Sequence, residues 1–234
     1  MIQFSSINPN STFAELLELE RKEFALYQHH DFLDYQKQRL AFLEKHLNSE
    51  SAKALHGYVK TNQPKIGVFA GSFSPFHKGH FNVLQKAEKL FDKVIIAFGK
   101  NPAKDLHTWP VPKTISNRQI TSYNSLLTDH IESFGYDVTV VRGLRNSTDF
   151  QYEQNQYRYI QELKPDIKII NIFFDKEFEH ISSSGIRTLE KYNKHQNYLI
   201  KLLLLLVKIP QRMFIPGLFQ KLFQTDKLLL IIVC

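Results

Sequence analysis

The sequence of 234 residues has little cysteine: its only one, Cys234, is the last residue. A lone terminal thiol excludes an internal disulfide framework, a zinc site built on thiolates and a cysteine nucleophile inside a cleft. The first residues, MIQFSSINPNSTF, also lack the positive segment and apolar run of a secretory signal. We therefore expect a protein of a reducing compartment, the cytoplasm.

No apolar run is long enough to cross a bilayer, which takes about 20 mostly apolar residues. The longest runs, at 202–207 and 228–233, are six residues each, and Lys208 and Pro210 follow the first of them. We expect no transmembrane segment. Burial of this tail against the domain or a sister subunit is the simpler interpretation, and peripheral membrane attachment is the alternative.

Two phosphate-binding signatures are missing, because the chain has neither a GxxxxGK[ST] loop nor a GxGxxG motif. P-loop hydrolysis and dinucleotide redox chemistry therefore lose their usual support. The net charge of +7 suggests polyanionic partners. No basic block accompanies it, so a nucleic-acid partner rests on the pI alone, and we expect none.

The pattern of apolar residues predicts an α/β protein with a Rossmann-like parallel sheet flanked by helices and an N-terminal helical extension. Helical spacing at 13–24 and again at 32–47 predicts a docking or oligomerisation hairpin in residues 1–62. Residues 63–198 alternate short apolar runs with amphipathic stretches, which is typical of βα units. Residues 199–234 form an apolar tail. Strands are expected at 66–70, 93–98, 137–141 and 167–174, and helices at 81–91, 118–134, 149–163 and 183–192.

The segment GSFSPFHKGH, residues 71–80, lies between an expected strand and an expected helix. Open α/β sheets bind ligands at the carboxyl ends of their strands, and a helix amino terminus offers free N–H groups to an anion. His77 and His80 can both face such an anion, and Gly79 would let the backbone approach it closely. The loop therefore predicts a phosphate site.

Two further clusters suit phosphate oxygens. Arg142-Gly143-Leu144-Arg145 follows an expected strand, where two guanidinium groups can act as fixed donors. Ion pairs with Asp149 or Glu153 are the alternative interpretation of these arginines. The stretch 179–184, EHISSS, precedes an expected helix, and its hydroxyls can cap that helix or hold phosphates.

Together with Pro102-Ala103-Lys104, these motifs resemble, in order and approximate spacing, those of the phosphopantetheine adenylyltransferases, nucleotidyltransferases of the HxGH type. The resemblance covers about residues 65–195, with a weaker echo at 214–218. It implies a fold for nucleotide binding and the use of ATP and Mg²⁺ to convert 4′-phosphopantetheine into dephospho-coenzyme A and pyrophosphate. It also implies a homo-oligomer, commonly a hexamer.

Residue roles follow from the resemblance alone. His80, Lys104 and Arg142 would be catalytic. The acceptor would be bound by Ser72, Lys104, Thr128 and Arg142. No protein ligand to a metal is implied, because Mg²⁺ would arrive on the ATP phosphates. The residues implied for ATP binding are Ser72, Phe73, His77, His80, Gly143, Leu144, Arg145, Glu153, Phe178, Glu179, His180, Ile181, Ser182, Ser183 and Ser184.

Several positions depart from the family pattern. Ser74 stands where the family usually has Asp, His77 where it has Thr, and Ile160 where it commonly has an Asn that contacts pantetheine. Gly185-Ile186-Arg187 is similar to the nicotinamide-mononucleotide enzymes. Two alternatives therefore stay open. One is adenylyl or cytidylyl transfer to another phosphorylated acceptor, such as nicotinamide mononucleotide, and the other is an inactive nucleotide-binding regulatory protein.

Overall fold

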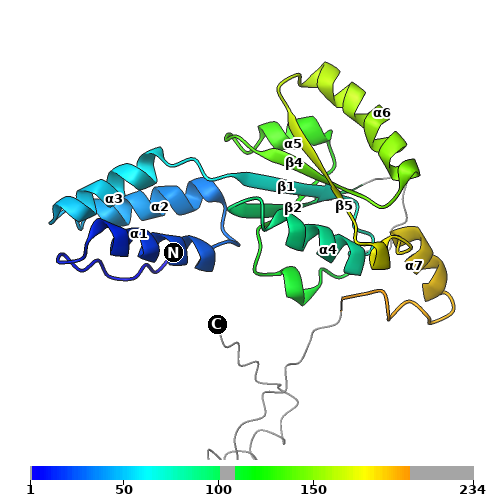
Figure 1. Cartoon of the computed structure of the whole chain (residues 1–234), viewed down its shortest axis with the longest axis horizontal. Helices are drawn as coiled ribbons and strands as arrows, with labels where there is room; N and C mark the ends of the chain where they lie inside the picture. The colour runs from blue at the N-terminus through cyan, green and yellow to red at the C-terminus, as the bar shows by residue number, and fades with distance from the viewer. Residues whose placement is uncertain (1, 101–108, 201–234) are drawn as a thin grey trace, which may run out of the picture. The chain divides into compact units, whose positions relative to one another are not determined.

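The structure is a computed structural model that describes residues 2–100 and 109–200 (Figure 1). Lys104, both apolar runs of the tail and the segment 214–218 lie outside the described residues. In the ranges that are described, no helix combines the length and apolarity that crossing a bilayer requires.

The N-terminal extension consists of three helices, α1 (Phe13–Leu26), α2 (Phe32–Glu44) and α3 (Glu50–Thr61) (Figure 1). Leu16, Leu43 and Leu55 are almost fully buried in their shared core. The helical spacing predicted two helices here, and the structure adds a third, α3, which begins after Ser49. Its hydroxyl accepts a hydrogen bond from the backbone N–H of Ala52, as an N-cap does.

The chain after the extension forms a sheet of five parallel strands in the order β3-β2-β1-β4-β5. This confirms the Rossmann-like α/β fold. The strands are β1 (Ile66–Gly71), β2 (Lys93–Gly99), β3 (Ile120–Tyr123), β4 (Thr139–Leu144) and β5 (Lys168–Phe173). The helices that follow the extension are α4 (Lys78–Ala87), α5 (Leu127–Glu132), α6 (Ser147–Leu163) and α7 (Ser183–Glu190), with 3₁₀ turns at Lys113–Ile115 and Lys176–Phe178.

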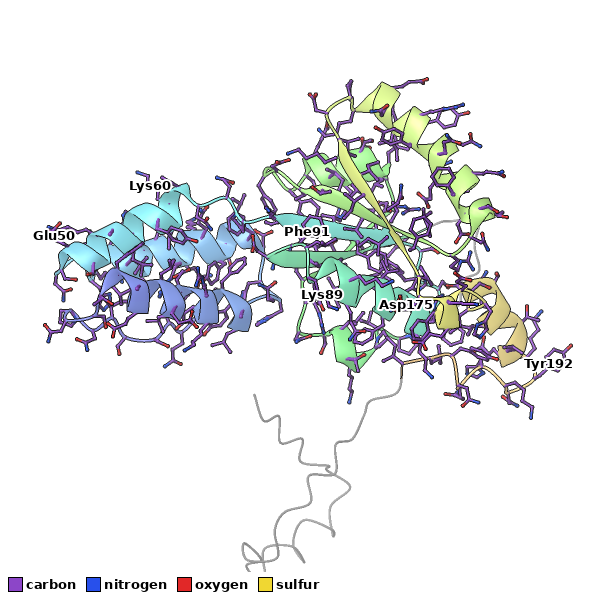
Figure 2. All side chains as sticks on the ribbon, in the orientation of Figure 1. Glu50, Lys60, Lys89, Phe91, Asp175 and Tyr192 are labelled. Atoms are coloured by element: carbon purple, nitrogen blue, oxygen red, sulfur yellow. The ribbon has the colours of Figure 1, made fainter. Side chains whose placement is uncertain are left out.

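Each face of the sheet has its own apolar core. Alternate residues of a strand point to opposite faces, so Phe69 packs with Val83 and Leu84 of α4, while Val68 packs with Ile131 of α5 on the other side. An ion pair also connects α4 to the residues after β5: Lys86 lies 2.7 Å from Asp175, which is labelled in Figure 2. Burial of the strands on both faces explains their continuous apolar runs.

Two elements differ from the expected pattern. Ile120–Tyr123 is a short edge strand inside the expected helix 118–134, and only Leu127–Glu132 of that range is α-helical. Arg142 and Gly143 lie within β4 and not after it, because β4 stays paired with β5 as far as Leu144 and Phe173. Pairing with a neighbouring strand, which is not visible in local periodicity, decides both cases.

The connector between α1 and α2 is anchored at the amino end of β2. The ammonium group of Lys93, almost fully buried, donates hydrogen bonds to the backbone carbonyls of Gln28 and His30. Asp31 caps α2 with one carboxylate oxygen and accepts a hydrogen bond from the Tyr136 hydroxyl with the other. Burial lowers the pKa of Lys93 to about 8, and the charge of Asp31 opposes the shift.

The stability that Lys93 contributes should rise with pH above about 8. Between pH 8 and about 10.4 the unfolded chain holds a proton on this amine that the folded chain has released. We therefore expect the difference in free energy of unfolding between the wild type and Lys93→Met to change in favour of the wild type. The change should be at most about 1.4 kcal/mol per pH unit. A constant difference in denaturant titrations from pH 7.5 to 9.5 would contradict this.

Candidate active site

The site lies at the carboxyl ends of β1 and β4, the central strands between which the strand order reverses. Crevices at such a switch point are where open α/β sheets bind ligands. β1 ends at Gly71 and leads into the loop 72–77, which is followed by α4. β4 delivers Arg142 to Leu144 to the same edge.

The imidazoles of His77 and His80 are stacked, with ring centroids 3.6 Å apart. The backbone N–H of His77 donates to Nδ1 of His80 at 3.3 Å, so the neutral ring carries its proton on Nε2. His80 can therefore donate one hydrogen bond from Nε2 to an anion. Burial, reinforced by His77 and Arg145, holds the pKa of His80 well below its usual value, which keeps the ring neutral at physiological pH.

Phe73 supports the His80 ring from the loop side. Its own ring is buried, with a centroid 4.9 Å from that of His80. The backbone of Phe73 has φ of 43°, a left-handed conformation that costs a non-glycine residue about 1–2 kcal/mol. Burial of an aromatic side chain offsets a cost of this size.

The glycines of the two motifs serve packing. A Cβ on Gly79 would lie 2.4 Å from the Phe174 ring, and a Cβ on Gly143 would lie 2.7 Å from the same ring. The expectation that Gly79 lets the backbone approach an anion is therefore not what the contacts indicate: the nearest atoms belong to Phe174, at the end of β5. One aromatic ring thus sets the spacing between the histidine motif and the arginine motif.

Arg142 forms a forked ion pair with Glu153 of α6. Its Nε and Nη2 donate to the two carboxylate oxygens at 2.8 and 2.6 Å, and its Nη1 donates to the Ala70 carbonyl at 2.7 Å. Both side chains are largely buried, with exposed fractions of 22% and 14%. The alternative sequence interpretation, an ion pair, is therefore present at Arg142.

Arg145 is held in the same way by Asp149, in the first turn of α6. Its Nε and Nη2 each donate to a carboxylate oxygen at 2.7 Å, and its backbone N–H donates to the same carboxylate. A guanidinium has five N–H bonds, so two directions remain for Arg142 and three for Arg145 after the bonds to described residues. The ion pairs fix both groups and leave donors for an anion.

The serines at the start of α7 have different partners. Ser182 caps the helix, since its hydroxyl accepts from the backbone N–H of Gly185 at 3.0 Å. Ser183 donates to the Pro75 carbonyl at 3.1 Å, and Arg187 donates to the Ser74 carbonyl. The start of α7 therefore holds the histidine loop from its far side.

The amino terminus of α4 is less open than the sequence suggests. The N–H of Lys78, the first of the helix, donates to the Tyr198 carbonyl at 3.1 Å, and His77 forms an isolated bridge with Leu199. One of the N–H groups that the sequence leaves for an anion is thus used by the chain itself.

A cavity of about 290 Å³ collects most of the predicted nucleotide residues. Leu144 and Ile181 are instead buried, and Phe178, Glu179 and His180 do not line it. Asp149, Tyr152, Phe174 and Arg187 also line it, and none of them was predicted as a site residue. Asp149 was expected only as an ion-pair partner and Arg187 only as part of the Gly185-Ile186-Arg187 motif. The predicted residues in its wall are Ser72, Phe73, His77, His80, Arg142, Gly143, Arg145, Glu153, Ser182, Ser183 and Ser184.

A second cavity of about 870 Å³ lies between α5, α6 and the sheet. Three of the residues predicted to bind the acceptor, Ser72, Thr128 and Arg142, line it, and Ile160 does so as well. The two cavities share Arg142 and Glu153 in their walls. Two pockets that meet at one guanidinium can place two anionic substrates in contact.

The chain matches the cytidylyltransferase-like family over residues 68–189, which is more than half of its length. The chain is therefore a nucleotidyltransferase of the cytidylyltransferase-like family.

The curated relatives narrow this class. The chain is 36% identical over 139 residues to the phosphopantetheine adenylyltransferase of Mycoplasma capricolum, covering 56% of this chain and 99% of the relative. It is 34% identical to the enzyme of that name from Streptococcus pneumoniae (56% and 86% covered) and 35% identical to that of Cytophaga hutchinsonii (55% and 91%). The chain belongs to the phosphopantetheine adenylyltransferase family.

Solved structures resemble the chain more distantly. A crystal structure described as a nicotinate-nucleotide adenylyltransferase from Vibrio parahaemolyticus gives a TM-score of 0.41 at 17% identity, covering 59% of this chain and 88% of that one. A bifunctional NMN adenylyltransferase/ADP-ribose pyrophosphatase from Francisella tularensis gives 0.39 at 19%, covering 58% and 44%.

Gly79→Ala should destabilise the fold by about 1–3 kcal/mol, because the added methyl group would overlap the Phe174 ring. Phe174→Leu, which removes the edge of that ring, should restore part of the loss. We expect the double variant to be more stable than the sum of the two single changes predicts, measured as free energies of unfolding in denaturant. Strict additivity would show that the two residues do not interfere.

We expect His77 to make the free energy of unfolding depend on pH in the acid range. Burial, and then the charge of Arg145, lower the pKa of His77 to about 3. Below about pH 6.5 the unfolded chain binds a proton here that the folded chain refuses, so stability falls as the pH drops from 6.5 towards 3. We expect His77→Asn to show a shallower fall, by up to about 1.4 kcal/mol per pH unit. Parallel curves for the two proteins would contradict this.

Proposed function

We propose that the chain transfers the adenylyl group of ATP to 4′-phosphopantetheine, giving dephospho-coenzyme A and pyrophosphate. The observation that carries the proposal is the pair of cavities that meet at Arg142. The smaller has donors for phosphates, and the larger has room for an extended acceptor. The names of the curated relatives support the same reaction.

The reaction needs no nucleophile from the protein. An anionic phosphate oxygen of the acceptor attacks the α-phosphorus of ATP, the new P–O bond forms, and the bond to the bridging oxygen of pyrophosphate breaks. Catalysis then consists of holding two polyanions in line and stabilising charge on the five-coordinate phosphorus. This suits a site with imidazole and guanidinium donors on a rigid sheet edge.

His80 would stabilise the reacting phosphate through Nε2–H. Because its other nitrogen accepts from the His77 backbone, the ring is oriented before substrate binds. Arg142 would contact the acceptor phosphate at the junction of the cavities. Lys104, which is not among the described residues, would bind the same phosphate. Arg145 and Ser182 to Ser184 would hold the phosphates of ATP.

The smaller cavity carries too little positive charge to balance the phosphates of ATP without a cation. Among its described lining residues, three arginines and two carboxylates leave a net charge of +1, and both carboxylates are engaged by arginines. No group of three or more metal-ligating side chains occurs in the described ranges. We therefore assign Mg²⁺ to the phosphate oxygens of ATP and water, the ligands it prefers, where it would neutralise charge on the leaving pyrophosphate.

We also propose that the enzyme is a homo-oligomer and works in the cytoplasm. This location suits a biosynthetic reaction on soluble phosphorylated metabolites. Sedimentation velocity of the purified chain measures the oligomeric state directly.

His80→Ala should lower kcat about 100-fold to 1000-fold, the loss typical of removing one donor that stabilises a transition state. The measurement is pyrophosphate release from ATP in the presence of 4′-phosphopantetheine. His56→Ala, on α3 and outside both cavities, is the matched control and should retain wild-type turnover.

Parallel reactions with nicotinamide mononucleotide and with no acceptor test the choice of substrate. Release with 4′-phosphopantetheine alone supports the proposal. Release with nicotinamide mononucleotide alone, or ATP binding without turnover, would overturn it.

A further inference from the structure

A third cavity, of about 420 Å³, lies where the N-terminal extension meets the linker to β1. Among the described residues, it shares no lining residue with the two cavities of the candidate active site. All of its lining residues except Asp92 precede the range 68–189 that matches the family. Its volume is that of a site for a small molecule. The lining residues on the three helices are Glu20, Arg21, Phe24, Phe32, Tyr35, Gln36, Tyr58 and Val59.

The polar groups in the buried part of this wall are hydrogen-bond acceptors with fixed positions. Glu20 is 7% exposed, and its carboxylate accepts from the Tyr35 hydroxyl at 2.9 Å and from Nε of Arg39 at 2.7 Å. A carboxylate has about four acceptor sites, so these two bonds leave capacity for a ligand. The side chain of Gln36 donates through Nε2 to the Val59 carbonyl at 3.0 Å, and its oxygen accepts from no described residue. A ligand that donates hydrogen bonds therefore suits this wall.

The buried network behind the wall has an excess of negative charge. It contains the carboxylates of Glu20 and Glu23 and the guanidinium of Arg39, and the Tyr35 side chain interacts with all three charges. Two carboxylates and one guanidinium leave a formal net charge of −1. Arg39 has no exposed surface, so a ligand meets the network through Glu20 and Tyr35. A buried charge without a counter-charge is costly, and a cation bound at Glu20 would supply the missing charge.

Aromatic rings form the apolar part of the wall. The ring of Phe24 contacts that of Tyr35 edge to face, with centroids 5.4 Å apart, and contacts that of Phe32 in the same way at 6.4 Å. Tyr58 adds a ring from α3. Aromatic faces attract cations and also bury apolar groups. An ammonium group on an apolar body matches both properties, whereas no group of three or more metal-ligating side chains occurs in the described part of the chain.

The rim of the cavity carries exposed charges of both signs. Arg21 lies 3.7 Å from Glu18, and the carboxylate of Asp92 accepts from the backbone N–H of Lys65 at 2.8 Å. Exposed charges are screened by water and salt, whereas a buried carboxylate such as that of Glu20 is screened much less. The buried group therefore decides which ligand charge the cavity prefers.

We propose that this cavity binds a small organic amine in its protonated form. The ammonium group donates to the carboxylate of Glu20 and to the side-chain carbonyl of Gln36, and the apolar body lies against the rings of Phe24 and Tyr58. The inference does not rest on the proposed function, because the cavity is separate from the candidate active site. It gives the N-terminal extension a role of its own, the binding of a ligand.

The test is calorimetric titration of the full chain with three probes that share an indole ring. Tryptamine carries an ammonium group, tryptophol a neutral hydroxyl and indole-3-acetate a carboxylate. Two variants change the cavity: Glu20→Gln removes the charge and keeps the shape, and Phe24→Leu removes an aromatic face and keeps an apolar side chain. Glu44→Gln on α2 and Phe173→Leu on β5 are the matched changes at positions that do not line it.

Tryptamine should bind the wild type about tenfold more tightly than tryptophol, because a hydrogen bond to a charged group is the stronger one. Indole-3-acetate should bind more weakly than either. Glu20→Gln should abolish the preference for tryptamine over tryptophol, and Phe24→Leu should weaken tryptamine about threefold to tenfold. Both matched controls should keep the wild-type affinities.

Equal affinity of the wild type for tryptamine and tryptophol would overturn the inference, as would no binding of tryptamine at millimolar concentration. An unchanged preference in folded Glu20→Gln would overturn it as well. Because this variant leaves Arg39 without its ionic partner, its fold is checked by circular dichroism. If it does not fold, Phe24→Leu decides, and a tryptamine affinity equal to that of the wild type then overturns the inference.

Discussion

The fork between Arg142 and Glu153 is the contact on which the arrangement of the site depends. It joins the central sheet to α6, and it lies in the wall that both cavities share. Removing one partner of a largely buried ion pair costs about 3–5 kcal/mol, because the other charge stays buried without compensation. A guanidinium held this firmly keeps its position whether or not an anion is present. An internal carboxylate thus fixes the guanidinium before any ligand binds.

Packing around Phe174 also fixes the positions of the site residues. The Phe174 ring fills the space left by the missing side chains of Gly79 and Gly143, and β5, which ends beside it, is paired with β4. The histidine loop, the arginine strand and the edge strand therefore cannot move independently. Such rigidity suits a reaction in which position and fixed charge provide the catalysis.

The central strands and the motifs of the site could be predicted from the sequence. The features that depend on contacts between distant segments could not. The motifs predicted the strand–loop–helix at 66–87 and the meeting of His80, Arg142 and Arg145, because each residue lies near the carboxyl end of a strand of one parallel sheet. The edge strand Ile120–Tyr123 was missed because four residues show no periodicity. Phe174 was missed because its effect is to fit against two glycines distant in sequence. Asn171 is brought beside Arg142 by strand register, which residue order alone does not encode.

The short bridge between His77 and Leu199 has a practical meaning for anyone who handles the protein. The last residues that the structure describes before the tail, up to residue 200, lie next to the histidine loop, whereas additions before α1 attach to the helical extension. In a chain shortened to residue 200, an affinity tag or reporter fused at the carboxyl side would begin beside the histidine loop, so the amino side is the better choice for immobilisation and for labels.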